Sequence, residues 1–296
     1  MKSRTRSYTC RSLGIVAGLL VATGSVQAQE PGGDQCDDLA AALGNGVHSA
    51  LSTALAAGLS PGVGLQNDMW ATIVDSLGRV CAVVNSGGAP AGEQWLGSRV
   101  ISAQKANTAN AFSLHAGAGG LVPGLALSTA NLWSATQPGG SLFGLQFSNP
   151  VDPRVAYGDN SLPGGEDGPG SPAYGAVDDP MVATFIGGVN VFGGGLALYR
   201  SDGRLLGAVG VSGDTSCADH VVAWRTRDAL GLDTVPAGVS ATGDDNIIFD
   251  LAPTNPGKSG FEHLASESGF GHPECGFGER PIAEALPTTH PVNPVE

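Results

Sequence analysis

Basic residues are scarce in this chain, and their scarcity limits what the protein can bind. The 296 residues include 14 Lys and Arg against 27 Asp and Glu, which gives a formal net charge of −13. An acidic surface repels phosphate backbones, because nucleic-acid affinity depends on cations that neutralise phosphates. Nucleic-acid binding is therefore not expected.

Long apolar runs and repeats of fixed period are also missing. The apolar stretch Leu13–Val26 falls short of the ~20 residues that a membrane-spanning helix needs. The 46 glycines and 19 prolines stay below the share typical of low-complexity chains, and 42% of the residues are hydrophobic. Stable membrane insertion and wholesale disorder are not expected, and a core can form.

The N-terminus has the pattern of a secretory signal peptide. Basic residues precede the apolar stretch, no acid occurs before Glu30, and the stretch ends in Val26-Gln27-Ala28, a small-x-small cleavage pattern. Cleavage after Ala28 removes four basic residues and leaves 10 Lys and Arg against 27 acids, a net charge of −17. We predict an exported protein, periplasmic or extracellular.

Four cysteines follow the cleavage site, and an even count in an exported protein is typical of two disulfides. They are Cys36, Cys81, Cys217 and Cys275, which allow three connectivities. The spaced pairs Cys217/His220 and His272/Cys275 also suit a tetrahedral zinc site. An oxidising compartment favours a Cys217–Cys275 disulfide over zinc, and Cys36–Cys81 is then the remaining pair.

Patterns of apolar residues and turns predict an α+β fold. Helices are expected over 38–59 with a break at Gly44-Asn45-Gly46, over 98–112, around 127–135 and over 216–230. Strands are expected over 69–74, 80–84, 142–147, 189–199 and 205–211. Hairpins alternating with helices imply a mostly antiparallel sheet of about five strands flanked by helices.

Two further features of the domain concern its glycines and small residues. Ala103, Ala106 and Ala109 form a stripe on the helix predicted over 98–112, which would let another backbone approach closely. Residues 137–182 are rich in Gly-Gly, Pro-Gly and Asp-Gly dipeptides, which indicate a long loop or insertion.

The cluster Asp244-Asp245-Asn246 is interpreted as a turn rather than a calcium site.

We therefore divide the chain into four parts. A signal peptide (1–28) and a short flexible segment (29–37) precede an α+β domain over 38–235, with its insertion at about 137–182. An irregular C-terminal extension (236–296) follows, and a disulfide ties it to the domain.

Two stretches of the domain resemble the GlcG/HbpS family of haem-binding proteins. Residues 102–112 (SAQKANTANAF) are similar to the family's K-A-x-T-A-x-x-F helix. Residues 193–214, followed by Asp219, are similar to its G-G-x-P-I … G-x-x-I-G-A-I-G-V-S-G … D hairpin and helix start. The resemblance extends over roughly 65–230. It implies a small α+β domain, often a homo-oligomer, that binds haem.

The resemblance also implies where haem or a similar tetrapyrrole would bind. Thr129, in the segment Leu127–Leu132, corresponds to a threonine near the haem in the family. Haem binding needs an apolar slot, an axial ligand and cations for the propionates. The candidate cofactor-binding residues are His220, Thr129, Lys105, Phe112 and Arg99. His115 and His272 are further candidates for the axial ligand.

The leading hypothesis is an exported haem-binding protein of the GlcG/HbpS type that acts in haem uptake, storage or redox sensing, without catalytic turnover. No catalytic residue is assigned. One alternative is a metal- or haem-dependent enzyme that uses Cys217, His220, His272 and Cys275. Another is a cofactor-free scaffold that binds a partner.

Overall fold

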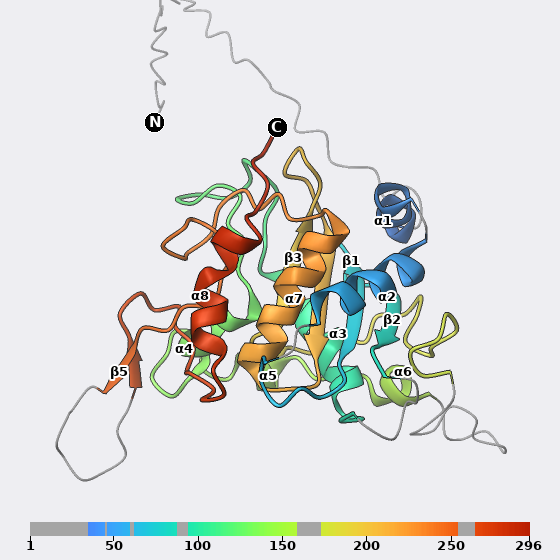
Figure 1. Ribbon diagram of the computed structural model, residues 1–296, viewed down its shortest axis with the longest axis horizontal. Helices are drawn as coiled ribbons and strands as arrows, with labels where there is room; N and C mark the ends of the chain where they lie inside the picture. The colour runs from blue at the N-terminus through green and yellow to red at the C-terminus, as the bar shows by residue number, and fades with distance from the viewer. Residues whose placement is uncertain (1–34, 45, 60–61, 88–93, 159–172, 254–263) are drawn as a thin grey trace, which may run out of the picture. The chain divides into compact units, whose positions relative to one another are not determined.

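The computed structural model describes residues 35–44, 46–59, 62–87, 94–158, 173–253 and 264–296, all within a compact unit that spans Gly33–Glu296 (Figure 1). The predicted signal peptide, 1–28, and most of the predicted flexible segment, 29–37, lie outside the described residues. None of the helices described is both long enough and apolar enough to cross a membrane.

A four-stranded antiparallel sheet forms the centre of this unit (Figure 1). Its strands are β1 (Trp70–Asp75), β2 (Val80–Asn85), β3 (Gly195–Tyr199) and β4 (Leu205–Ser212), in the order β2-β1-β4-β3. Both predicted hairpins are present, and the pairing of β1 with β4 joins them. A separate sheet contains β5 (Leu251–Pro253) and β6 (Leu264–Ser266). The α+β class is confirmed, with four strands in the main sheet rather than about five.

The helices largely follow the sequence prediction. The longer ones are α1 (Gln35–Leu43), α2 (Val47–Gly58), α3 (Ser98–Ala111), α7 (Ser216–Leu230) and α8 (Glu279–Thr289). The short ones are η1 (Thr129–Leu132), α4 (Trp133–Thr136), α5 (Leu145–Ser148) and α6 (Pro153–Tyr157). The predicted break between α1 and α2 is confirmed, since Gly44 and Gly46 both have positive φ.

Three predictions of local structure were wrong. Residues 142–147 form a turn and part of α5 instead of a strand, because Gly144 takes a left-handed conformation. The strand predicted over 189–199 begins only at Gly195, after Gly194 with φ +118°. The C-terminal extension, expected to be irregular, contains α8, whose Ala283 and Leu286 are fully buried in the main core.

Helices cover both faces of the main sheet. Apolar residues of α2 and α7 share one core cluster with Ile73 and Val209 of the sheet. Residues of α3 share a second cluster with Val74 and Ala208, which point to the other face because strand side chains alternate. Figure 1 shows α7 and α2 together in front of the strands.

The small residues of α3 lie directly on the strands, as the sequence predicted. Ala103, Ala106 and Ala109 are fully buried. A Cβ atom added to Gly210 of β4 would lie 2.0 Å from the Ser102 carbonyl oxygen. Glycine at this strand position therefore permits direct contact between the helix backbone and the sheet.

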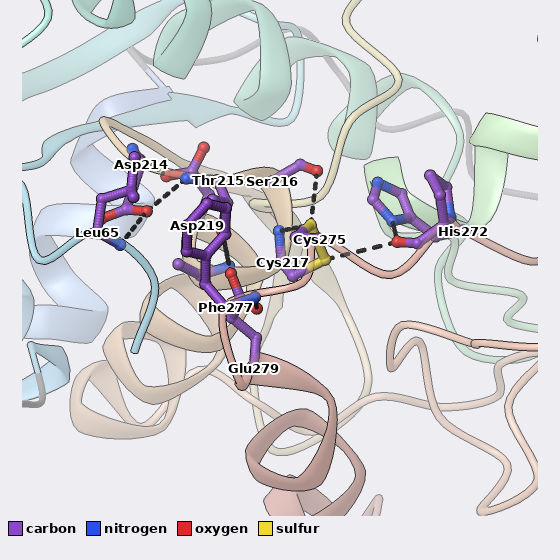
Figure 2. Close-up of a disulfide and its surroundings, with 12 residues drawn as sticks. Leu65, Asp214, Thr215, Ser216, Cys217, Asp219, His272, Cys275, Phe277 and Glu279 are labelled. Atoms are coloured by element: carbon purple, nitrogen blue, oxygen red, sulfur yellow. Dashed lines mark hydrogen bonds between the residues drawn. A yellow bond between two sulfur atoms is a disulfide. The ribbon is translucent and has the colours of Figure 1, made fainter. Parts of the chain in front are cut away.

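Two disulfides staple the fold. Cys36 of α1 is bonded to Cys81 of β2, and Cys217 of α7 to Cys275 of the C-terminal extension. This is the connectivity favoured from the sequence. Figure 2 shows the second disulfide beside the start of α7.

Candidate functional site

A small pocket lies where the first turns of α3 and α7 meet the end of β4. Its volume is about 260 Å³. The lining residues are Trp95, Ser98, Ile101, Lys105, Phe192, Ser212, Asp214, Ser216 and Asp219. Ser98, Ile101 and Lys105 are spaced three and four residues apart, so they share one face of α3. We call this site the Lys105 pocket.

A buried ion pair forms part of the wall of the Lys105 pocket. Lys105 Nζ lies 2.6 Å from Asp219 Oδ2 and also donates to the Val211 carbonyl oxygen at 3.1 Å. Asp219 Oδ1 accepts the backbone N–H of Asp214 at 2.9 Å. Burial lowers the pKa of Lys105 and raises the pKa of Asp219 to about 6, each against the pull of its partner. Each charge of the pair is therefore desolvated and depends on its partner.

The triple glycine at the start of β3 makes room for this ion pair. A Cβ on Gly194 would lie 2.4 Å from the Val211 carbonyl oxygen and 3.1 Å from Lys105 Nζ. A Cβ on Gly193 would lie 2.4 Å from the Ser216 carbonyl oxygen. The glycine backbone therefore runs close to both α7 and Lys105, where a larger residue would clash.

Two aromatic side chains at the rim of the Lys105 pocket are partly exposed. Trp95 is 51% exposed and Phe192 is 49% exposed. Ile101 of α3 lies between full burial and exposure. An exposed aromatic rim above a polar wall suits a flat apolar ligand that carries polar groups at one edge.

The structure places Arg99 in a different environment from Lys105. Its side chain is 1% exposed, forms an ion pair with Asp179 and donates to the Ala156 carbonyl oxygen at 2.6 Å. The guanidinium also lies 3.7 Å from the centre of the Tyr174 ring. Arg99 thus holds the long insertion against α3 and is not part of the Lys105 pocket.

Thr129 and Phe112 are not among the residues that line the Lys105 pocket. Thr129 is fully buried, and its hydroxyl accepts the backbone N–H of Gly195 at 2.9 Å. Phe112 ends α3 and packs against a small apolar cluster that includes Leu127 and Val189. Both residues support the elements that form the pocket.

His220 is fully buried one residue after Asp219. Its Nε2 lies 3.1 Å from Asn246 Oδ1 and 3.1 Å from the Ile247 backbone nitrogen. Burial lowers its pKa to about 3, so the ring is neutral at physiological pH. His115, by contrast, lies at the surface, where its Nδ1 accepts the Leu205 backbone N–H.

The cluster Asp244-Asp245-Asn246 has a structural role that the sequence did not predict. Asp245 is fully buried and pairs with Arg227 through two contacts of 2.8 Å. Asn246 contacts His220 and also bonds the Ala283 carbonyl oxygen of α8. The sequence does show Arg227 as a basic residue in the last turn of α7. Its partner Asp245 comes from a separate turn, so the ion pair could not be predicted from the helix alone.

The four residues of the predicted zinc alternative are brought together only in part. Cys217 and Cys275 form the disulfide, and a ring nitrogen of His272 and both sulfurs lie within 4.8 Å of one another. His220 does not belong to this group. His272 is 1% exposed, and burial lowers its pKa to about 4.

A larger cleft, of about 610 Å³, lies elsewhere. Residues 133–141 form one wall, and residues of 264–269 form the other. Trp133 in this cleft stacks at a tilt near His272, with ring centroids 6.2 Å apart. The cleft contains none of the residues that carried the family resemblance.

The fold is a four-stranded antiparallel sheet with helices on both faces, which places the protein in the α+β class. The sequence model of a family described as "Haem degrading protein HbpS-like" matches residues 47–227, which is more than half of the chain. The chain belongs to this family. A search of curated proteins finds no match.

Two solved structures are similar to the chain. One is described as a PduOC:heme complex, with 23% identity, 61% of this chain and 89% of that chain covered, and a TM-score of 0.37. The other is the Klebsiella pneumoniae protein ORFY of family DUF336, with 21% identity, 62% and 89% covered, and a TM-score of 0.37.

The residues present match a haem group in one respect and differ in two. The partly exposed Trp95 and Phe192 match the flat apolar macrocycle. The residues that line the Lys105 pocket include no histidine, cysteine or methionine for the iron. The two candidate cations for the propionates, Arg99 and Lys105, are each paired with a buried aspartate. The aromatic side chains of the pocket therefore suit a flat ring, and its lining supplies no imidazole to the metal.

Proposed function

We propose that the protein binds haem or a similar tetrapyrrole at the Lys105 pocket, with the macrocycle lying against Trp95 and Phe192. The observation that carries the proposal is the origin of the lining residues. Lys105 comes from the first family-like stretch, and Ser212, Asp214 and Asp219 come from the second. Both stretches lie within the residues matched by the family.

The location of the match favours the Lys105 pocket over the larger cleft. A property common to a family must reside in residues that its members share. Every residue lining the Lys105 pocket falls within 47–227, whereas one wall of the 610 Å³ cleft falls outside that range. The larger volume of the cleft is therefore not a reason to place the ligand there.

The ring would be held mainly by stacking and by polar contacts at one edge. A bound haem would supply its redox-active iron. This chain would supply the aromatic rim, and Lys105 and Asp219 would face the edge of the ring and hold a proton there. The polar pair excludes apolar groups from the inner wall and so orients the ligand.

We propose further that a second copy of the chain completes the site. Pockets for drug-sized ligands usually measure about 300–1,000 Å³ and bury most of the ligand, and the Lys105 pocket is smaller. A homo-oligomer that covers the exposed face of the ring would provide the missing burial.

The two disulfides support export to an oxidising compartment. We propose that the exported protein acts there in haem uptake, storage or redox sensing.

The enzyme alternative has less support. Zinc coordination by Cys217, His220, His272 and Cys275 needs free thiolates, and the two cysteines are bonded to each other. A cofactor-free scaffold remains the outcome if no tetrapyrrole binds.

Titration of the mature protein with hemin tests the proposal. We expect a saturable Soret shift, weakened by Trp95→Ala or Phe192→Ala and retained by His220→Gln. Phe143→Ala is the matched control, because Phe143 is 60% exposed but lies in the insertion outside the Lys105 pocket. No Soret shift at stoichiometric hemin would exclude tetrapyrrole binding.

The same samples test the oligomer and the position of the site. Light scattering during gel filtration should show a mass above one chain with hemin bound. A shift that is lost in His220→Gln and unchanged in both rim variants would place the ligand elsewhere.

A further inference from the structure

The Cys217–Cys275 disulfide lies against a histidine that has a free ring nitrogen. His272 Nδ1 lies 2.7 Å from the Pro273 carbonyl oxygen, which can only accept, so Nδ1 carries the proton. Nε2 is therefore the unprotonated nitrogen, and it is buried with no hydrogen-bond partner in the described part of the chain. Figure 2 shows His272 beside the two sulfurs.

The geometry of the group is that of a metal site closed by a disulfide. Both sulfurs and a ring nitrogen of His272 lie within 4.8 Å of one another. Tetrahedral zinc with Zn–S bonds of about 2.3 Å separates two sulfurs by ~3.8 Å. Breaking the bond between Cys217 and Cys275 would let the two sulfurs move apart to that spacing.

The surroundings of Cys275 stabilise a thiolate once the disulfide is broken. Cys275 Sγ accepts the backbone N–H of Cys217 at 3.2 Å, in the first turn of α7, and the Ser216 hydroxyl lies 3.5 Å away. A thiolate at a helix N-terminus is favoured by the helix dipole and by free N–H groups. Cys81 has no such environment among the contacts of the other disulfide, since its sulfur lies 3.6 Å from the Arg79 carbonyl oxygen.

We propose that Cys217, His272 and Cys275 form a reduction-gated site for a borderline-soft divalent cation of the Zn²⁺ type, with two thiolates and one imidazole as ligands. Three protein ligands leave the fourth position open to water, as in catalytic zinc sites. Two thiolates and a neutral imidazole balance the charge of the ion, so the site can stay largely buried.

The opening reaction needs a dithiol as reductant, and its electrons balance. A thiolate of the dithiol attacks Cys275 Sγ, because Cys275 is the more exposed of the two cysteines. The electron pair of the S–S bond leaves on Cys217 Sγ, which takes a proton. The second thiol of the dithiol then closes its own disulfide and releases Cys275 as a thiolate. Two electrons pass to the protein, and metal binding later displaces the proton from Cys217.

Cobalt titration after reduction tests this proposal on the full mature chain. The protein is reduced with dithiothreitol, freed of reductant by anaerobic gel filtration and titrated with Co²⁺. We expect a 1:1 thiolate-to-cobalt charge-transfer band with tetrahedral d–d bands, absent from the oxidised protein and displaced by Zn²⁺. His272→Ala should weaken Co²⁺ binding about tenfold or more.

Two double variants separate this group from the other disulfide, because Cys36, Asp75 and Cys81 also lie within 4.8 Å of one another. Cys36→Ser/Cys81→Ser should keep the cobalt bands, and Cys217→Ser/Cys275→Ser should lose them. Bands that survive in the second variant, or that are unchanged in His272→Ala, overturn the proposal. So does a reduced protein that binds no Co²⁺, whether folded or unfolded by circular dichroism.

Discussion

Buried cations dominate the chemistry of this protein at the scale of single residues. Three ion pairs have nearly no exposure: Arg99 with Asp179, Lys105 with Asp219, and Arg227 with Asp245. Only 10 Lys and Arg follow the predicted cleavage site, so nearly a third of them are inside. Three of these ten positive charges are thus structural partners of buried acids and not surface contacts for an anionic ligand.

Lys105→Met should destabilise the fold strongly. The substitution leaves Asp219 buried without its cation, and breaking a buried pair in this way costs about 3–5 kcal/mol. Lys105→Met/Asp219→Leu should recover part of the loss, because both charges are then removed. Urea unfolding of the three proteins measures this, and a double variant no more stable than the single one would contradict it.

Acid should destabilise the protein through its buried histidines. The pKa values of His220 and His272, about 3 and about 4, lie below the unfolded value near 6.5, so the unfolded state takes up more protons as pH falls below 6.5. Their stabilising contribution is complete above pH 6.5. Together they lose about 3 kcal/mol between pH 6.5 and pH 5, because the loss per histidine approaches ~1.4 kcal/mol per pH unit only once the unfolded histidine is mostly protonated.

Asp219 acts in the opposite direction, because its pKa is raised to about 6. Protonation of Asp219 in the folded state raises the free energy of unfolding by only about 1 kcal/mol by pH 5. The net effect of acid on stability is therefore still a loss. Urea unfolding at several pH values should show this slope, and His220→Gln should reduce it by about half of the histidine contribution. An equal slope in His220→Gln would show that His220 does not titrate as its burial implies.

The sequence predicted some residue roles and missed others for a physical reason. The expectation of two disulfides followed from the even number of cysteines, and the expected compartment favoured a Cys217–Cys275 disulfide over zinc. The environment of His220 did not, since Asn246 reaches it from a turn that is remote in sequence. Pairing of Arg99 with Asp179 likewise depends on how the insertion folds back, and no local pattern encodes that.

At the scale of elements, a glycine substitution can test the close contact between the backbones of α3 and β4. Gly210→Ala would place a Cβ 2.0 Å from the Ser102 carbonyl oxygen and 2.5 Å from the Ala106 nitrogen, both in helix backbone. We expect a loss of about 3 kcal/mol or more, because neither atom can move without shifting α3. Gly97→Ala is the control, since a Cβ there meets nothing within 4 Å.

Thermal or urea unfolding of both glycine variants measures the difference. A Gly210→Ala protein as stable as Gly97→Ala would mean that α3 does not lie as close to β4 as the structure shows.

Elements with strong periodicity and clear turn residues were predictable, and elements set by tertiary contacts were not. Both hairpins of the main sheet and α7, which ends at Gly231 in a left-handed conformation, follow local signals. The helix α8 carries Pro287 in its interior, which argues against a helix. Burial of Leu286 in the main core and the nearby Cys217–Cys275 disulfide favour it nonetheless.

At the scale of the whole molecule, charge sets how an anionic ligand approaches. The 27 acids outnumber the basic residues by 17 after the predicted cleavage, and three of the cations that remain are buried in pairs. The surface therefore presents an excess of negative charge. Hemin carries two propionates, so long-range electrostatics should oppose its binding and stacking should favour it.

Hemin affinity should consequently rise with ionic strength. The Debye length falls from about 30 Å at 0.01 M salt to about 8 Å at 0.15 M, which screens the repulsion between propionates and the acidic surface. Contacts of the ring with Trp95 and Phe192 are apolar and are not weakened by screening. We expect a few-fold tighter binding at the higher salt concentration, measured by Soret titration of the mature protein. Weaker binding at high salt would instead show that a cation reaches the propionates, and Lys105→Met would identify whether that cation is Lys105.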